Sequence, residues 1–366
     1  MSSASQPSCL EIAASSVQAR QRIRNHIYQT PLIPARSTGK STNATVLFKA
    51  ENFQLTGSFK LRGAMAKMSA SSSASKGGRL ITASSGNHGI GTAFAARSLD
   101  KDLTVVLPES VVPSKLEKIK ALGVAVILHG AETGLAEQHA QHLASTGQYT
   151  YISPYNDFDV ISGQGTIALE LLEQCDKVDN IFISMGGGGL ISGIGSVLKA
   201  FSPHTKIWGI SASNSMALAT SIHAGKVIKT EHLDTLADAV AGGIDEDTIT
   251  LSLATSVIDE FVECDEDAIV HALKALALEE NMIVEGAAAL ALAGFEKVRQ
   301  RVIGQTSLLK CMFLTFTTTT HAQPIGGHCF NLRDHFGGNT TSGYITMTQD
   351  AFAWQRNGDP ETLGIH

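Results

Sequence analysis

Gly57-Ser58-Phe59-Lys60-Leu61-Arg62-Gly63 places one lysine beside an aromatic residue and among small residues, just after a polar, turn-prone run. A lysine in such a pocket loses hydration, which favours the neutral amine and lowers the pKa of the side chain. A neutral amine can attack a carbonyl carbon and form a Schiff base. An isolated lysine is more simply one of the 28 lysines and arginines of a solvated surface. Other segments of the chain argue against that interpretation of Lys60.

A second segment, Thr82-Ala83-Ser84-Ser85-Gly86-Asn87-His88-Gly89, lies between an apolar run and an alanine-rich run. This order predicts a strand, a tight turn and the first turn of a helix. The start of a helix offers unpaired backbone N–H groups, and Ser84, Ser85 and Asn87 add side-chain donors. The turn can therefore hold a carboxylate or an aromatic oxygen. By itself it would equally be an ordinary helix N-cap.

Four consecutive glycines, Gly186 to Gly189, follow the strand-like run Phe182-Ile183-Ser184-Met185 and precede a helical pattern. Glycine lets the backbone approach closely, so several N–H groups at a helix start can converge on a phosphate. A dinucleotide-binding turn is the competing interpretation, but it requires an acidic residue at the end of the next strand. That strand, Lys206 to Ser211, carries no carboxylate, and no Walker lysine follows the glycines. A phosphate site without a dinucleotide fits better.

Taken in order, these segments resemble the fold-type II pyridoxal-phosphate enzymes, in particular the branch of serine/threonine dehydratases (threonine ammonia-lyases) and serine racemases. Two further runs match that family, Ile161 to Glu170 and Glu285 to Ala289. On the element lengths expected of such α/β units, the resemblance covers roughly residues 10 to 310. It implies pyridoxal 5'-phosphate as the cofactor and a fold like that of the tryptophan synthase β chain, with two parallel α/β domains and the cofactor between them.

Alternating strand-like and helix-like runs independently favour a parallel α/β architecture. Helices are predicted at residues 114–122 and 134–145. Buried strands are predicted at residues 46–50, 104–108, 124–128, 151–153 and 181–183.

The resemblance also implies a division into domains. A small domain of residues 54–153 is expected to be inserted into a large cofactor-binding domain of residues 1–53 and 154–315. Residues 316–366 form a tail rich in Thr, Gly and Asn that resembles neither the family's usual ending nor its regulatory domains. Such a composition predicts an atypical or poorly packed segment.

The composition is that of a soluble globular protein, with 43% hydrophobic and 17% charged residues among 366. A net charge of -6 gives no sign of nucleic-acid binding, and no apolar run approaches a membrane span. The five cysteines are scattered without metal-site or disulfide spacing, which suits a reducing compartment. A Ser-rich start with several arginines is faintly transit-like, but Glu11 lies within it, so a cytoplasmic protein is expected.

Residue roles follow from the resemblance position by position. Lys60 matches the lysine that forms the Schiff base and then removes the Cα proton, and Ser85 matches the serine that in racemases faces the opposite side of the substrate. The residues expected to bind the cofactor are Phe59, Lys60, Asn87, Gly186, Gly187, Gly188, Gly189 and Thr315. Those expected to bind the substrate carboxylate are Ser84, Ser85, Gly86 and His88. His88 is also open to interpretation as a structural hydrogen-bonding residue.

The family's chemistry implies a lyase that converts L-threonine or L-serine to a 2-oxo acid and ammonia by β-elimination. Reprotonation by Ser85 would instead invert the amino acid, so a serine racemase with dehydratase side activity is the alternative. A pyridoxal-phosphate-binding protein with little turnover is the second alternative. A nicotinamide oxidoreductase is disfavoured by the missing acidic residue. The family further implies a homodimer.

Three departures from the family pattern bear on activity. Ser211, Ser215 and Ala217 stand where the family has carboxylates for a divalent cation, so that site is expected to be weak or absent and no metal is expected. Ala239 replaces a glycine expected beside the cofactor ring. Thr315 stands where the family carries Ser-Gly-Gly-Asn, and its hydroxyl is expected to meet the pyridine nitrogen.

Overall fold

The structure is a computed structural model, and two compact units divide it, Met1–Leu314 and Thr315–His366. Thr315 and most of the tail after it lie outside the described residues. Those described are 6–70, 78–311, 328–331, 343–348 and 351–356, with side chains up to residue 309.

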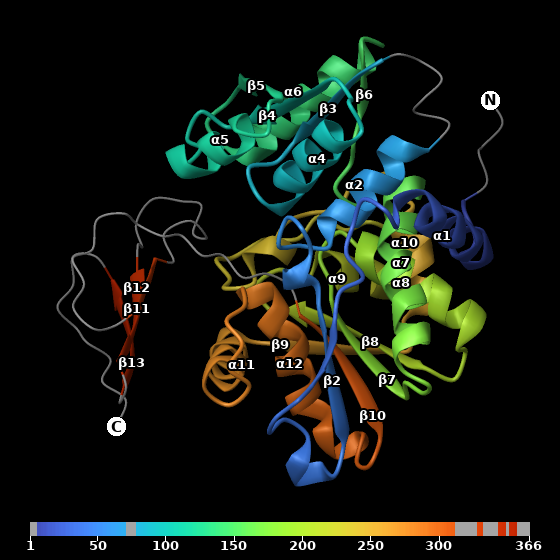
Figure 1. The fold of residues 1–366 in the computed structure, drawn as a ribbon, viewed down its shortest axis with the longest axis vertical. Helices are drawn as coiled ribbons and strands as arrows, with labels where there is room; N and C mark the ends of the chain where they lie inside the picture. Colours follow the sequence, from blue (N-terminus) through green and yellow to red (C-terminus); the bar gives the residue numbers. More distant parts are fainter. Residues whose placement is uncertain (1–5, 71–77, 312–327, 332–342, 349–350, 357–366) are drawn as a thin grey trace. The chain divides into compact units, whose positions relative to one another are not determined.

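A six-stranded sheet forms the centre of the first unit, in the spatial order β1-β2-β10-β7-β8-β9 (Figure 1). Only β1 runs antiparallel to its neighbour, and the other pairs are parallel. The strands are β1 (Leu32–Pro34), β2 (Thr45–Ala50), β7 (Asn180–Ser184), β8 (Lys206–Ala212), β9 (Glu260–Cys264) and β10 (Thr306–Cys311).

Both faces of this sheet are buried under helices, as the apolar strands require. Ile181 and Ile183 of β7 join the core on one face, whereas Phe182 between them packs on the other face against Trp208 and Phe295. The first face carries α1 (Cys9–Ile23), α7 (Phe158–Gln174), α8 (Gly189–Phe201), α9 (Ala217–Ala224) and α10 (Thr250–Val257). The second face carries α11 (Glu266–Leu278) and α12 (Gly286–Val298).

A four-stranded parallel sheet, in the order β5-β4-β3-β6, is the second sheet of the same unit. Its strands are β3 (Arg79–Ala83), β4 (Leu103–Leu107), β5 (Ala125–Leu128) and β6 (Tyr149–Tyr151). One face packs on α6 (Thr133–Ser145). The other face packs on α2 (Lys60–Ser69), α4 (Asn87–Ser98) and α5 (Pro113–Lys120).

Glycines bring α7 unusually close to its neighbours. A side chain on Gly163 would collide with the backbone of α2 at Arg62 and Gly63, and one on Gly63 would collide with Val160 of α7. Gly193 of α8 meets the α7 backbone in the same way, at Ile161. Because interiors are close-packed, these crossings fix α2 against α7 and α8. The first residue of α2 is Lys60, so its position is set by this packing.

The predicted domain boundaries fall just after the 3-10 turn η2 (Glu51–Phe53) and just after β6. The four-stranded sheet lies between them in sequence, and the six-stranded sheet lies outside them. Residues up to Leu314 nevertheless form one compact unit, so the division into a small and a large domain stays a prediction. The remaining 3-10 turns are η1 (Lys40–Thr42), η3 (Asp238–Val240) and η4 (Arg299–Arg301).

The second unit contains an antiparallel sheet of three strands, β11 (His328–Asn331), β12 (Gly343–Thr348) and β13 (Ala351–Arg356). In register, Tyr344 pairs with Asn331 on one side and with Gln355 on the other. The sequence predicted only an atypical tail here. Throughout the described part of the chain, no helix has the length and apolar character needed to cross a membrane.

Candidate active site

Lys60 begins α2, and its backbone N–H donates to the Ser58 hydroxyl at 3.2 Å. The Lys60 Nζ donates to the carbonyl oxygen of Pro154 at 2.9 Å and lies 5.4 Å from the centre of the Phe59 ring. Burial lowers the pKa of Lys60 to about 8, and the negative charge of Glu285 only partly opposes this. The amine is therefore partly neutral near physiological pH, as the sequence led us to expect.

The Ser84–His88 turn follows β3 and leads into α4. The Gly86 N–H donates to the Ser84 hydroxyl at 3.2 Å, and α4 starts at Asn87. A side chain on Gly89 would collide with the Ser84 carbonyl, so the turn closes this tightly only with glycine there. Ser84, Ser85, Gly86 and Asn87 are half-buried. Backbone N–H groups of the first helical turn remain available at this point.

The turn and Lys60 lie close together because α4 packs directly on the start of α2. A Cβ on Gly91 would lie 3.0 Å from the backbone nitrogen of Leu61. The Asn87 side chain also donates to Glu285 at 3.4 Å, and Glu285 is the carboxylate that acts on the Lys60 amine. Glu285, only 6% exposed at the start of α12, thus joins two predicted site residues.

Glu285 was not among the site residues predicted from the sequence. The signal was present, because Glu285 opens the run Glu285 to Ala289 that matched the family. Its neighbour Gly286 cannot carry a side chain, since a Cβ would collide with the Leu236 carbonyl. That close approach holds the start of α12 against the segment that leads to Ala239.

His88 is buried, and its Nε2 lies 3.0 Å from the Thr82 hydroxyl and 3.1 Å from the Ile152 carbonyl. Burial and the positive charge of Lys60 lower the pKa of His88 to about 3, so the ring is neutral. The Nε2 atom thus already has hydrogen-bonding partners within the protein. A contact between His88 and a substrate carboxylate would need another of its N–H groups, and it stays a prediction.

The Gly186–Gly189 loop connects β7 to α8, and Gly188 has a φ of 88°, a conformation that favours glycine. The Thr250 hydroxyl donates to the Gly187 carbonyl at 2.7 Å. The loop ends at the first N–H groups of α8, where an anion is stabilised by free donors and by the helix dipole. The residues present therefore fit a phosphate group.

Pro154 and Tyr155 link the lysine to this loop. Pro154 accepts the hydrogen bond from Lys60, and the ring of the next residue, Tyr155, packs on Gly187. Of the predicted site residues, the structure therefore brings Lys60, Phe59, the Ser84–His88 turn and the glycine loop into one region. Ala239 is exposed, and Thr315 lies outside the described residues.

The positions of the family's cation site are occupied by protein contacts. Ser211, Ser215 and Ala217 are buried, and the Ser215 hydroxyl accepts from the Gly242 N–H and lies 3.0 Å from His232 Nδ1. Among the residues that the structure describes, no cluster of His, Cys, Asp and Glu is placed to hold a metal ion. The weakness of that site stays a prediction.

A buried cluster of charged side chains includes Arg62, two residues after Lys60 in the sequence. The sequence analysis did not identify this cluster. Arg62 makes paired hydrogen bonds to the carboxylates of Glu51 and Glu170, and Lys49 donates to Glu170 at 2.6 Å. All four side chains are almost fully withdrawn from solvent. Burial alone would lower the pKa of Arg62, but Glu51 and Glu170 outweigh it and raise that pKa.

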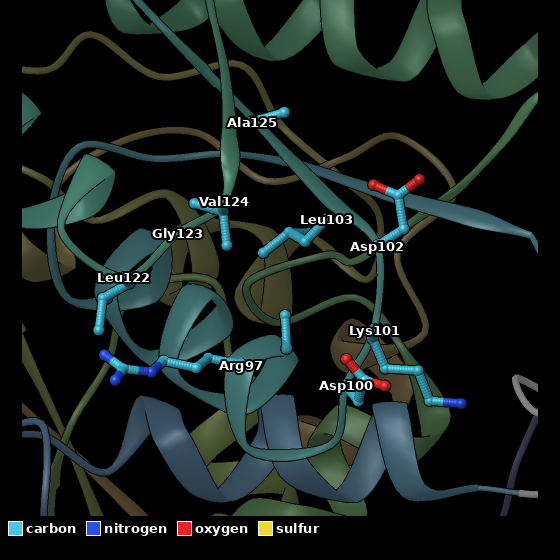
Figure 2. A pocket seen from close by; sticks show the side chains of 10 residues that line it. Arg97, Asp100, Lys101, Asp102, Leu103, Leu122, Gly123, Val124 and Ala125 are labelled. Atoms are coloured by element: carbon cyan, nitrogen blue, oxygen red, sulfur yellow. The ribbon is translucent and has the colours of Figure 1, made fainter.

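A separate cavity of about 340 Å³ lies where β4 and β5 begin, lined by Arg97, Asp100, Lys101 and Asp102 over a floor that includes Leu103 (Figure 2). The Ser84–His88 turn follows the other end of β3, which runs parallel to β4. The cavity therefore opens at the opposite edge of the sheet from Lys60, and it is not part of the candidate site.

Fold and site together fit one class of protein: an α/β enzyme whose glycine loop and buried lysine suit a phosphorylated carbonyl compound. A family model described as "Pyridoxal-phosphate dependent enzyme" matches residues 23–309. The chain therefore belongs to the pyridoxal-phosphate-dependent enzymes, with pyridoxal 5'-phosphate as its cofactor, and its fold is fold-type II.

Relatives and solved structures agree with this assignment. The catabolic L-threonine dehydratase TdcB of Staphylococcus aureus (strain USA300) is 37% identical over 276 residues, 75% of this chain and 79% of that protein. Threonine deaminase isoform 2 of Solanum lycopersicum, in its processed form, has a TM-score of 0.78 at 30% identity and covers 85% of both chains. Maize serine racemase has a TM-score of 0.74 at 29% identity, over 81% of this chain and 91% of that one.

Proposed function

We propose that this protein is a pyridoxal-phosphate-dependent ammonia-lyase that converts L-threonine or L-serine to a 2-oxo acid and ammonia by β-elimination. The observation that carries the proposal is the Lys60 amine, whose pKa burial lowers to about 8 beside the Ser84–His88 turn. The similarity to a threonine dehydratase over most of the chain supports the β-hydroxy amino acid as substrate.

The residues that would hold the cofactor follow from the site. The N–H groups of Gly186 to Gly189 would bind its phosphate, Asn87 its ring hydroxyl, and Phe59 would pack beside its ring. Thr315, which lies outside the described residues, stays a prediction from the family resemblance. When bound, the cofactor supplies an electron sink that stabilises negative charge at the Cα of an amino acid.

Lys60 would bind the cofactor and then take the proton from Cα. A base works best when its pKa is near the working pH, and a pKa of about 8 meets that condition. The Pro154 carbonyl, which accepts from Nζ, aims the amine without giving it a compensating negative charge. The Ser84–Gly86 turn and the first N–H groups of α4 would orient the substrate carboxylate.

A serine racemase with dehydratase side activity is the alternative function. The likeness to maize serine racemase supports it, though not more than the threonine deaminase supports the lyase. The half-buried Ser85 would then donate a proton to the face of the substrate opposite Lys60. A pyridoxal-phosphate-binding protein with little turnover, caused by Ala239 and the atypical tail, is the second alternative.

The assay that tests the proposal measures 2-oxo acid and D-amino acid together, from L-serine and from L-threonine, with added cofactor. The lyase predicts 2-oxo acid as the main product. Excess D-serine would favour the racemase, and an absorbance band of lysine-bound cofactor without either product would favour the binding protein. Protein that gives neither band nor product would refute all three.

Ser85→Ala separates the two enzymatic alternatives further. We expect it to suppress inversion more than deamination, because elimination needs no proton donor on the second face. Ser145→Ala, which removes a hydroxyl bonded to the His142 carbonyl within α6, is the control. Equal loss of both activities in Ser85→Ala would contradict the role given to Ser85.

We further propose a homodimer in the cytoplasm, with a small domain of residues 54–153 inserted into the large one. Exposed aromatic side chains at Tyr28 and Phe53 support a dimer; the Gln54 side chain, next to Phe53, hydrogen-bonds the backbone of Tyr28. Free thiols at Cys9, Cys175 and Cys264 suit a reducing compartment. Light scattering of the purified protein tests the dimer, and a monomer would exclude it.

A further inference from the structure

Residues 153–157, in the connection between β6 and α7, contact both Lys60 and the glycine loop of the candidate site. Pro154 holds the Lys60 amine through its carbonyl oxygen, at 2.9 Å. Tyr155 lies against the glycine loop, and Asn156 reaches across to the segment that precedes α10. None of these three residues was assigned a role from the sequence.

Tyr155 covers one side of the glycine loop. Its ring occupies the space that a side chain on Gly187 would need, and its carbonyl oxygen lies 2.8 Å from the place of a Cβ on Gly189. Tyr155 therefore leaves no room for a side chain at Gly187 or Gly189, whatever binds to the N–H groups of the loop. A ring in this contact also keeps the loop from moving toward Tyr155.

Tyr155 and Asn156 also hydrogen-bond to residues 245–249. The Tyr155 hydroxyl accepts from the Asp245 N–H at 2.9 Å. Asn156 accepts from the Ile249 N–H at 3.0 Å and donates to the Asp245 carboxylate at 3.0 Å. Three hydrogen bonds thus span this segment from one end to the other.

Residues 245–249 lead directly into a residue that contacts the glycine loop. Thr250 follows Ile249 directly, and its hydroxyl donates to the Gly187 carbonyl at 2.7 Å. The Thr248 hydroxyl lies 2.8 Å from that of Thr250 and so limits its rotation. The contacts therefore form a closed circuit, from Tyr155 through residues 245–250 to Gly187 and back to the Tyr155 ring.

We propose that Tyr155 and Asn156 are positioning residues for the phosphate of the cofactor: they hold the Gly186–Gly189 loop in its binding geometry and in register with Lys60 on Pro154. This proposal depends on the proposed function, in which the loop binds the phosphate of the cofactor. Neither residue needs to touch the cofactor. Each acts through Gly187, by the ring contact or by the circuit through Thr250.

The test compares binding of pyridoxal 5'-phosphate with binding of pyridoxal, which lacks the phosphate but keeps the aldehyde that reacts with Lys60. Tyr155→Phe keeps the ring and removes one hydrogen bond of the circuit, and Asn156→Ala removes two. Each net hydrogen bond corresponds to about threefold to tenfold in affinity. We expect Tyr155→Phe to bind pyridoxal 5'-phosphate about threefold to tenfold more weakly and Asn156→Ala about tenfold to a hundredfold more weakly. The affinity of both variants for pyridoxal should stay that of the unmodified protein.

Tyr151→Phe is the matched control, because it removes a tyrosine hydroxyl that donates to Glu137 and takes part in none of the hydrogen bonds of the circuit. It should leave both affinities unchanged. Equal weakening for both ligands, or weakening no larger than in Tyr151→Phe, would overturn the proposal. If Asn156→Ala fails to fold, Tyr155→Phe decides alone, since its ring packing is intact. Failure of the unmodified protein to take up pyridoxal 5'-phosphate would instead count against the proposed function.

Discussion

Among the described residues, burial lowers the pKa of two lysines, and one of them, Lys60, has the role of base in the proposed function. Lys49, fully buried in β2, donates to the Glu170 carboxylate, the Thr30 carbonyl and the Gln174 side chain. Lys60, at the start of α2, donates to one neutral carbonyl, that of Pro154. Burial lowers the pKa of both amines. What differs is the partner, and the partner decides whether the amine serves as a structural cation or as a base.

The difference teaches that desolvation alone does not identify a reactive lysine. Lys49 belongs to a cluster in which two cations, Lys49 and Arg62, face two carboxylates, Glu51 and Glu170. A hydrogen-bonded carboxylate keeps an amine charged and immobile. Lys60 has Glu285 only as an electrostatic neighbour, so its neutral form remains accessible.

The largest expected effect comes from removing the reactive amine. Lys60→Ala should abolish the absorbance of lysine-bound cofactor and lower deamination at least about a thousandfold, because both attachment and the base are lost. Its thermal midpoint should stay close to that of the unmodified protein. Spectra and 2-oxo acid production measure this. A retained band in Lys60→Ala would assign the chemistry to another lysine and erase the contrast with Lys49.

The opposite outcome is expected for the charge cluster. Arg62→Met leaves Glu51 and Glu170 buried without their main partner, which costs about 3–5 kcal/mol of unfolding free energy. Chemical denaturation measures it. The control is Arg20→Met, which breaks an ion pair with the exposed Glu173 and should cost no more than about 1 kcal/mol. Similar losses in the two variants would show that the buried cluster is not structural.

The pH dependence of cofactor uptake tests the state of the Lys60 amine. Burial sets its pKa at about 8, below the ordinary lysine value, and only the neutral amine attacks. The rate at which apoprotein takes up the cofactor should therefore rise about tenfold between pH 7 and pH 9 and then level off. Stopped-flow absorbance measures this rate. A rise that continues undiminished beyond pH 10 would mean an ordinary, solvated lysine.

The smallest effect is expected at Glu285. Its negative charge raises the pKa of Lys60 against the effect of burial, so Glu285→Gln should lower that pKa further. Uptake of the cofactor at pH 7 should then become faster, by less than tenfold, while the amide keeps a hydrogen-bonding partner for Asn87. The same stopped-flow assay measures it. Slower uptake at pH 7 would mean that Glu285 acts on the amine in some other way.

The elements predicted from the sequence were those with local patterns. The strand predicted at residues 181–183 is β7, and the helix predicted at residues 134–145 is α6, one residue longer at its start. The strand predicted at residues 151–153 is β6 at Tyr149–Tyr151, two residues earlier. Ile152 still donates its N–H to the Ile81 carbonyl of β3, but its own carbonyl lies 3.1 Å from His88 Nε2. An apolar pattern marks burial and does not by itself fix where a strand ends.

The lysine and the glycine loop could be recognised because each is contained in one short run of residues. Glu285 and Arg62 could not be given their roles, since Asn87 and Glu285 are 198 residues apart and Arg62 and Glu170 are 108 apart. The same holds for Tyr155, whose partner Asp245 is 90 residues away. Such contacts depend on how the layers pack, and no local spacing encodes them.

The glycine crossings between α2, α7 and α8 have a consequence for how the apoprotein meets its cofactor. A helix locked at Gly63 against Gly163 cannot slide or rotate without opening the core, so the backbone of Lys60 is held in place before any ligand arrives. Loading then requires no rearrangement of the scaffold around the lysine. Crystals grown without the cofactor should turn yellow on soaking and keep their lattice intact.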